Sequence, residues 1–198
     1  MYSPKIYFSS DHHFNHANVI KYDNRPFKSV EEMNKKLIFN HNQMVKKEDL
    51  CFFLGDICLR SGKEGGKAHY LDFLLQLTGR ITLIQGNHCK RNGVTGGLQS
   101  ASMYLSGINI FLVHDPIYAT TKYDLVLHGH THSMNKAMIL KESGKETLLV
   151  NVGINAWEYR PIEWEKIYAL YMRWKKGLIT PEVFDKKALA QHRQNRKR

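Results

Sequence analysis

Cysteine is scarce in this sequence, and the few that occur do not form the motifs of cysteine-rich proteins. Cys51, Cys58 and Cys89 are odd in number, and no two of them form a C-x-x-C pair. Neither a disulfide framework nor a zinc knuckle is therefore expected. We expect reduced thiols.

The sequence also lacks long apolar runs, internal repeats and low-complexity linkers. No stretch reaches the roughly 18 to 20 apolar residues of a membrane span, and residues 1–5 lead into a strand-like segment rather than a signal peptide. We therefore expect a soluble, cytoplasmic protein with no membrane partner. With 198 residues, 42% of them apolar, the chain can bury a sizeable core, and we expect a single domain over residues 1–185.

Acidic residues are outnumbered, with 18 Asp and Glu against 29 Lys and Arg and a net charge of +11. Residues 186–198, the basic tail, hold six cations and no acid, so the tail supplies +6 and the rest of the chain +5. Such a composition is typical of a solvated, disordered terminus. An arm that contacts nucleic acid is the alternative.

Short apolar runs alternate with amphipathic stretches before the tail. Runs typical of strands cover residues 6–8, 50–54, 81–84, 108–113 and 124–127, and residues 137–140 and 147–150 flank Ser143-Gly144 as a hairpin. Ser29 and Glu32 form a capping box for a helix that continues to about Met44. Further helices are predicted near residues 68–75, closed by Gly79, and over 162–174. The alternation predicts an α/β fold with mixed sheets.

Side chains that bind metals follow the ends of five predicted strands. In chain order these ends carry Asp11-His12-His13, Gly55-Asp56, Gly86-Asn87-His88, His114 and His128-Gly129-His130-Thr131-His132. The carboxyl ends of strands in an open α/β sheet converge on the crevice where ligands bind. One site assembled from distant positions is therefore expected.

Each of these residues alone has an ordinary explanation, because an Asp after a strand often caps a turn and a lone His often lies on the surface or in a core. Chance explains their joint placement poorly. Eight of the eleven histidines fall at 11–16, 88, 114 or 128–132. Glycine adjoins Asp56, Asn87 and His130, where the backbone must turn sharply.

The blocks D-x-H, G-D, G-N-H, a lone His and G-H-x-H occur in this order and resemble the signature of the calcineurin-like metallophosphoesterases. The likeness covers about residues 5–172, and stretches 10–16, 25–27 and 155–161 are similar to small bacterial and phage-encoded members. The resemblance implies an α/β fold, a four-layer sandwich of two mixed β-sheets flanked by helices.

The resemblance also implies two divalent metal ions. It assigns one ion to Asp11, His13, Asp56 and His132, and the other to Asp56, Asn87, His114 and His130, with Asp56 as the bridge. Independently, carboxylate and amide oxygens mixed with imidazoles, without thiolate, suit Mn²⁺, Fe²⁺, Zn²⁺ or Ni²⁺. We expect Mn²⁺ first.

The implied activity is hydrolysis of phosphomono- or phosphodiesters through a metal-bridging hydroxide, with His88 protonating the leaving oxygen. Two ions, two carboxylates and a hydroxide leave a charge of about +1, which attracts phosphate. The sequence departs from the family at Cys89, where many relatives have an acid. It departs again at Leu59, where serine/threonine phosphatases place an Asp that supports this histidine, so phosphoprotein phosphatase activity is disfavoured.

Asn15, His16, Arg25 and Arg60 are candidates for contact with substrate phosphate, and helix capping or surface exposure is the alternative for the first three. His128 is expected behind the site or in the core. The expected substrate is a nucleotide or another small phosphoester. Two other functions stay open: a nuclease acting on DNA or RNA, and a non-catalytic scaffold, against which the filled ligand positions argue.

Overall fold

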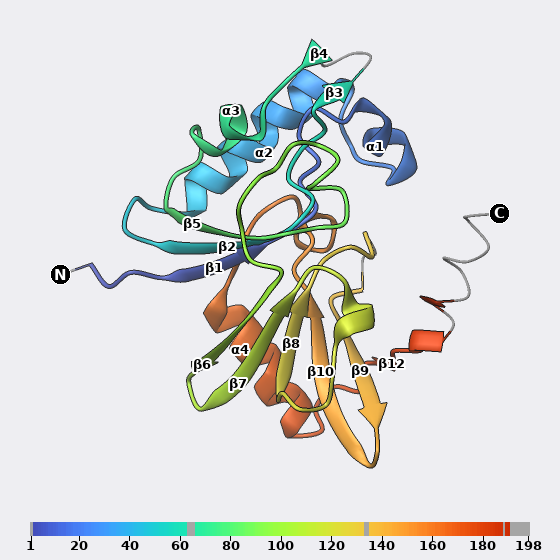
Figure 1. The fold of residues 1–198 in the computed structure, drawn as a ribbon. Helices are drawn as coiled ribbons and strands as arrows, with labels where there is room; N and C mark the ends of the chain where they lie inside the picture. Colours follow the sequence, from blue (N-terminus) through green and yellow to red (C-terminus); the bar gives the residue numbers. More distant parts are fainter. Residues whose placement is uncertain (1, 63–65, 133–134, 188, 191–198) are drawn as a thin grey trace.

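Two β-sheets form the centre of the computed structural model, which describes residues 2–62, 66–132, 135–187 and 189–190 (Figure 1). The first sheet has four strands, in the order β11 (Ile162–Glu163), β1 (Ile6–Ser9), β2 (Leu50–Leu54) and β5 (Arg80–Ile84). The second has six, in the order β12 (Glu182–Val183), β9 (Ala137–Glu142), β10 (Lys145–Asn151), β8 (Leu125–His128), β7 (Ile108–Val113) and β6 (Ser100–Leu105). A two-stranded sheet pairs β3 (Ser61–Gly62) with β4 (Gly66–Lys67).

Both large sheets are mixed. In the first, β1, β2 and β5 are parallel neighbours, and β11 pairs antiparallel with β1. In the second, β10, β8 and β7 are parallel neighbours, whereas β9 and β6 pair antiparallel at either side. Parallel strands end at the same edge of a sheet, so the loops that follow them gather there.

Figure 1 shows α2 (Val30–Met44) and α3 (Tyr70–Leu74) over the first sheet and α4 (Trp164–Lys175) beside the second, with α1 (Ala17–Tyr22) near one end of α2. Buried side chains of α1, α2 and α3 share one hydrophobic cluster with Tyr7, Cys51 and Phe53 of the first sheet. Two 3-10 turns, η1 (Pro116–Tyr118) and η2 (Ile154–Trp157), complete the described elements. The predicted fold class, two mixed sheets flanked by helices, is confirmed.

A second hydrophobic cluster lies between the two sheets. Phe8 and Leu54 of the first sheet, Leu112 and Leu127 of the second and Ile167 of α4 are all 0% exposed and belong to this cluster. Burying a side chain of this size contributes about 1.5–3 kcal/mol. The cluster therefore fixes how the two sheets sit, and with them the loops that carry the candidate site.

The start of α2 shows how local sequence determines this fold. Ser29 Oγ accepts a hydrogen bond from Glu32 N at 3.2 Å, as an N-cap should. The Glu32 carboxylate, however, accepts from Lys28 N at 2.8 Å instead of from Ser29 N, so the reciprocal half of the predicted capping box is shifted by one residue.

Several predicted boundaries differ from the structure. The sequence patterns miss α1, the half-exposed edge strand β6 and the short strands β11 and β12. The prediction that Gly79 closes a helix is wrong: α3 ends at Leu74, and Gly79, with φ +98°, lies immediately before β5. Short elements with few buried side chains carry little periodicity, which explains these misses.

The C-terminal end of the described chain contacts the second sheet. Lys186, the first cation of the basic tail, donates from Nζ to Ala119 O at 2.5 Å and to Glu142 Oε1 at 2.6 Å. Residues 191–198 lie outside the described residues, so the disordered tail stays a prediction there. Within the described part of the chain, no helix has both the length and the apolar character to cross a bilayer.

Candidate metal centre

The loops that follow four strands bring two groups of ligand-type side chains together. Asp11, His13 and His132 form the first group, and Asp56, His114 and His130 form the second. Within each group, the candidate ligand atoms all lie within 4.8 Å of one another. Residues separated by more than a hundred positions thus meet because β1, β2, β7 and β8 deliver their following loops to one region.

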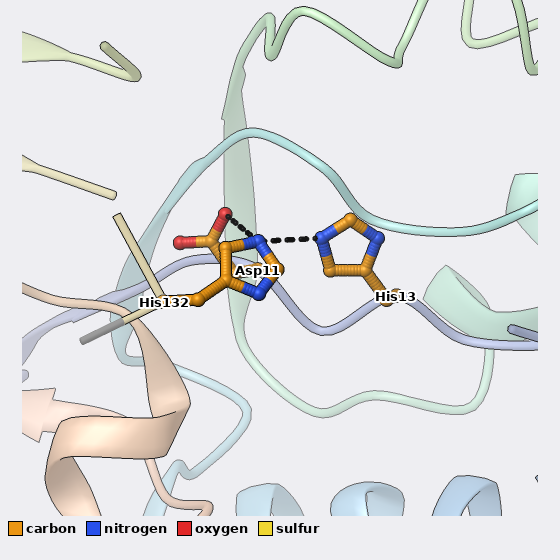
Figure 2. A group of neighbouring side chains, drawn as sticks. All are labelled: Asp11, His13 and His132. Carbon is orange, nitrogen blue, oxygen red and sulfur yellow. Dashed lines mark hydrogen bonds and ion pairs between the residues drawn. The ribbon is translucent and has the colours of Figure 1, made fainter. Parts of the chain in front are cut away.

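Figure 2 shows the first group, in which the His132 ring lies between the other two side chains. His132 Nε2 is 3.1 Å from His13 Nε2 and 3.5 Å from Asp11 Oδ1. Asp11 is 1% exposed, and both of its carboxylate oxygens accept from His130 N, at 3.1 and 2.9 Å. The loops after β1 and β8 are therefore tied together at this group.

The second group has similar spacing. His114 Nε2 lies 3.3 Å from Asp56 Oδ2 and 3.2 Å from His130 Nδ1. Asn87 Oδ1 is 2.9 Å from both of these histidine nitrogens. The amide oxygen of Asn87 thus adds a fourth candidate ligand atom beside the two histidines.

Asp56 links the two groups. Its Oδ2 atom lies 3.3 Å from His114 Nε2 and 3.9 Å from His13 Nε2. This oxygen is buried and has no hydrogen-bond partner among the described residues. The other oxygen, Oδ1, accepts from His88 N at 3.0 Å. A buried carboxylate oxygen that faces imidazoles of both groups is suited to share two cations.

The donor spacing fits metal coordination. Bonds of about 2.0–2.2 Å to nitrogen and oxygen place neighbouring donors about 2.9–3.5 Å apart in tetrahedral or octahedral geometry. The close contacts at the two groups run from 2.9 Å for Asn87 and His114 to 3.5 Å for His132 and Asp11, and all ligand atoms of one group lie within 4.8 Å of one another. The residues present therefore fit divalent ions with oxygen and imidazole ligands.

The backbone at the candidate ligands is strained. Five of them adopt positive φ without being glycine: Asp11 at 58°, His13 at 51°, Asp56 at 50°, His130 at 68° and His132 at 51°. Side chains with a Cβ rarely occupy this region, and such strain persists where the surrounding structure enforces it, often at functional sites. A Cβ at Gly129 would meet Asp11 Oδ2 at 2.5 Å, which explains this glycine beside His130.

Partners outside the two groups orient the rings. His132 Nδ1 lies 2.6 Å from Asp23 Oδ2, and the same oxygen accepts from Asn155 Nδ2 at 3.1 Å and Arg25 Nη2 at 3.3 Å. His114 Nδ1 lies 2.6 Å from Leu54 O. A bond on one ring nitrogen leaves the other to face a metal. The sequence interpretation missed Asp23 and gave Asn155 no site role, although Asn155 lies in a family-like stretch.

Arg25 lies behind the site, not at its surface. The side chain is buried, and it donates from Nη1 to His12 O at 2.9 Å and from Nη2 to Asp11 O at 2.8 Å. Its guanidinium therefore holds the loop that presents Asp11 and His13. This placement does not support the prediction that Arg25 contacts substrate phosphate.

The other predicted substrate contacts differ in their exposure to solvent. Asn15 is buried, and its side chain donates to Leu59 O at 3.2 Å, so it too supports the loop. Arg60 is exposed, and its backbone N donates to Asn92 Oδ1 at 3.1 Å. The rings of His16 and His88 lie 5.5 and 6.1 Å from the His13 ring between centroids. His88 is exposed and His16 half-buried, so both are accessible from the solvent side.

Electrostatics in the ion-free protein follow from burial and pairing. For Asp56, burial raises the pKa, but the adjoining His114, His13 and His88 outweigh it and lower the pKa below its usual value. For His114, burial lowers the pKa, but contact with Asp56 and the charge of Asp11 raise it to about 9. A cation entering this group must therefore displace a proton from His114.

His128 lies deeper. Burial lowers its pKa to about 4, against a hydrogen bond from Nδ1 to Gly129 O at 2.9 Å. The side chain is 0% exposed and belongs to neither ligand group.

The fold and the site agree with the resemblance seen in the sequence. Two mixed sheets with the five ligand blocks at their strand ends are similar to the arrangement expected for the calcineurin-like metallophosphoesterases, and two groups of His and Asp could hold metal ions. No family model matches the chain.

The chain belongs to the same family as an uncharacterized protein of Methanocaldococcus jannaschii. The two are 37% identical over 185 residues, which cover 91% of this chain and 97% of the relative. The gene 66 protein of Mycobacterium phage L5 is 35% identical over 82 residues, 41% of this chain and 38% of that protein. Among solved structures, a protein of unknown function from Aquifex aeolicus is similar in fold, with a TM-score of 0.63, 24% identity and coverage of 85% of this chain and 100% of that one.

Proposed function

We propose that this chain is a phosphoesterase that binds two divalent ions, Mn²⁺ first among them, and hydrolyses phosphomono- or phosphodiesters. The observation that carries the proposal is the pair of ligand groups joined by the buried Asp56 Oδ2 atom, 3.3 Å from His114 Nε2 and 3.9 Å from His13 Nε2. One ion would be held by Asp11, His13, Asp56 and His132, and the other by Asp56, Asn87, His114 and His130. When bound, two such ions lower the pKa of water and stabilise negative charge on phosphoryl oxygens.

His88 is proposed to hold the proton that the leaving oxygen takes. Its backbone is fixed from two sides, because His88 N donates to Asp56 Oδ1 at 3.0 Å and Asn92 Nδ2 donates to His88 O at 2.9 Å. The His88 residue is exposed and its ring lies 6.1 Å from the His13 ring between centroids, so it is proposed to reach a phosphoester bound at this group. A positioned acid of this kind contributes about 10²- to 10⁴-fold.

The remaining polar groups are proposed to support binding. The half-buried His16 ring lies 5.5 Å from the His13 ring between centroids and is proposed to orient a phosphoryl oxygen. Arg60 is tied through Asn92 to the segment that carries His88 and is proposed to contact substrate from there. Arg25 and Asn15 are proposed to hold the ligand loop, because their side chains bond to backbone carbonyls.

The test is reconstitution of activity in metal-stripped protein. Nitrophenyl phosphate and bis-nitrophenyl phosphate are offered with Mn²⁺, Ni²⁺, Zn²⁺ or Mg²⁺ added singly. We expect turnover that requires an added ion and saturates at two ions per chain. As a matched carboxylate control, Asp124→Asn should keep this turnover, because Asp124 accepts from Asn109 N at 3.0 Å, outside both ligand groups. No turnover of either ester with any ion would favour the scaffold alternative.

A further inference from the structure

A cavity of about 200 Å³ opens directly beside the second ligand group. Asn87 and His114 form the side that belongs to the candidate metal centre, and the rest of the lining is formed by Gln85, Gly86, Gln99, Val113, Asp115 and Tyr118. Two other cavities, of about 180 and 290 Å³, include none of the candidate ligands in their linings. The cavity beside the second ligand group is therefore placed to bind one portion of a molecule whose phosphoryl group lies at the ligand groups.

The walls of this cavity are fixed by hydrogen bonds before any ligand arrives. Gln99 Nε2 donates to Gln85 Oε1 at 2.7 Å, and Gln85 Nε2 donates to Gly96 O at 2.8 Å. Asp115 Oδ1 accepts from Ile117 N at 3.0 Å, which caps the 3-10 turn that carries Tyr118. Prearranged groups lose less conformational entropy on binding.

The chemistry of the lining selects the kind of group that fits. Among its residues, all within the described chain, there is no lysine or arginine, and Asp115 supplies a carboxylate. A further phosphate is therefore disfavoured. Tyr118 is 68% exposed and offers an aromatic face, while the paired amides offer hydrogen bonds to a planar polar edge. An aromatic face beside amides suits a nucleobase, which stacks and hydrogen-bonds at once.

His88 does not line this cavity but stands beside His13 of the first ligand group. A phosphoryl group at the ions would thus have two distinct neighbours, the proposed acid near one group and the cavity near the other. A monoester has one substituent and can occupy only one of these positions. A diester has two and can occupy both.

We propose that the cavity binds the nucleoside of a phosphodiester substrate, while the second ester group leaves on the His88 side. This inference rests on the proposed function. In the hydrolysis, a water oxygen bonds to phosphorus, the P–O bond to the leaving group breaks, and the departing oxygen takes a proton. A nucleoside monophosphate and an alcohol or phenol are the products, and no oxidant or reductant is needed.

The experiment keeps the leaving group constant. Thymidine 5′-(4-nitrophenyl phosphate) and methyl 4-nitrophenyl phosphate release the same nitrophenolate and differ in the retained group. With Mn²⁺ and the full chain, we expect kcat/KM to be roughly tenfold higher or more for the thymidine ester, the usual size of one base–aromatic stack. Tyr118→Ala should reduce this ratio to near one.

Tyr104→Ala is the matched control, because Tyr104 is 71% exposed but pairs with Asn109 at the opposite end of β7 from His114. It should leave the ratio unchanged. Equal kcat/KM for the two esters in the parent, or a ratio unaffected by Tyr118→Ala, would overturn the inference and leave the phosphoesterase proposal intact.

If neither ester is hydrolysed, the proposed function fails and the cavity is tested by binding. Calorimetry with Mn²⁺-loaded protein compares thymidine 5′-phosphate, ribose 5-phosphate and methyl phosphate. Tighter binding of the thymidine compound, lost in Tyr118→Ala, supports base recognition. Equal binding of thymidine and ribose phosphates assigns the cavity to a sugar and contradicts the inference, as does equal binding of all three.

Discussion

Replacing Asp23 by asparagine should weaken one metal position and spare the other. Asp23 Oδ2 lies 2.6 Å from His132 Nδ1, and no other described carboxylate bonds to that ring nitrogen. Removing such a partner typically costs about 10- to 100-fold in metal affinity, or about 1.4–2.7 kcal/mol. The second group should keep its affinity, because His114 is oriented by Leu54 O instead.

The assay is calorimetric titration of metal-stripped protein with Mn²⁺, beside elemental analysis after dialysis. We expect two ions per chain in the parent and one weakened ion in Asp23→Asn. Asparagine keeps the size of the side chain and an oxygen for Arg25 and Asn155 to bond, and it removes the negative charge that faces His132 Nδ1. Asp124→Asn serves as the control. Unchanged affinity for both ions in Asp23→Asn would refute the argument that Asp23 prepares His132.

Three further outcomes are expected. His88→Ala should retain both ions and lose about 10²- to 10⁴-fold in turnover. The loss should be smaller on nitrophenyl than on alkyl esters, because an alkyl leaving oxygen needs the proton more. Equal losses on the two kinds of ester would count against proton donation. Because the pKa of His114 is raised to about 9 in the ion-free protein, protons compete with the ion below that pH. Apparent Mn²⁺ affinity should therefore rise by up to about tenfold per pH unit toward pH 9 and then level off, with proton release measurable by calorimetry in two buffers. Deleting residues 191–198 while keeping Lys186 should flatten the salt dependence of nucleic-acid binding, by up to about 0.9 in log–log slope per lost contact, without changing nitrophenyl ester hydrolysis; a truncated chain that binds as the parent does would leave the tail a solvated end.

The location of the candidate site could be predicted from the sequence because a residue type that binds metals lies at the end of each of these predicted strands. His114 follows a short apolar run directly and Asp11 and Asp56 follow theirs within three residues, and parallel pairing delivers such ends to one edge. The pattern of apolar residues likewise predicted β2 and β7 at their observed bounds. Local periodicity and local order of residues were sufficient for these features.

Features that depend on tertiary placement could not be predicted in this way. Asp23 occurs in a loop without any periodic pattern, and its bond to His132 spans 109 positions. The sequence around Arg25 does not show whether its side chain contacts a phosphate or a backbone carbonyl. Only the fold shows that it donates to Asp11 O and His12 O. The cavity beside Tyr118 joins the ends of β5 and β7, which no single segment reveals.

The central claim is that one carboxylate, Asp56, joins two metal positions. The most direct measurement is the number of Mn²⁺ ions retained per chain, by elemental analysis, in the parent and in Asp56→Asn. The account predicts two ions in the parent, and in the variant loss of both positions together with ester hydrolysis, because Asp56 Oδ2 lies between His114 and His13. A variant that binds two ions as tightly as the parent would contradict it.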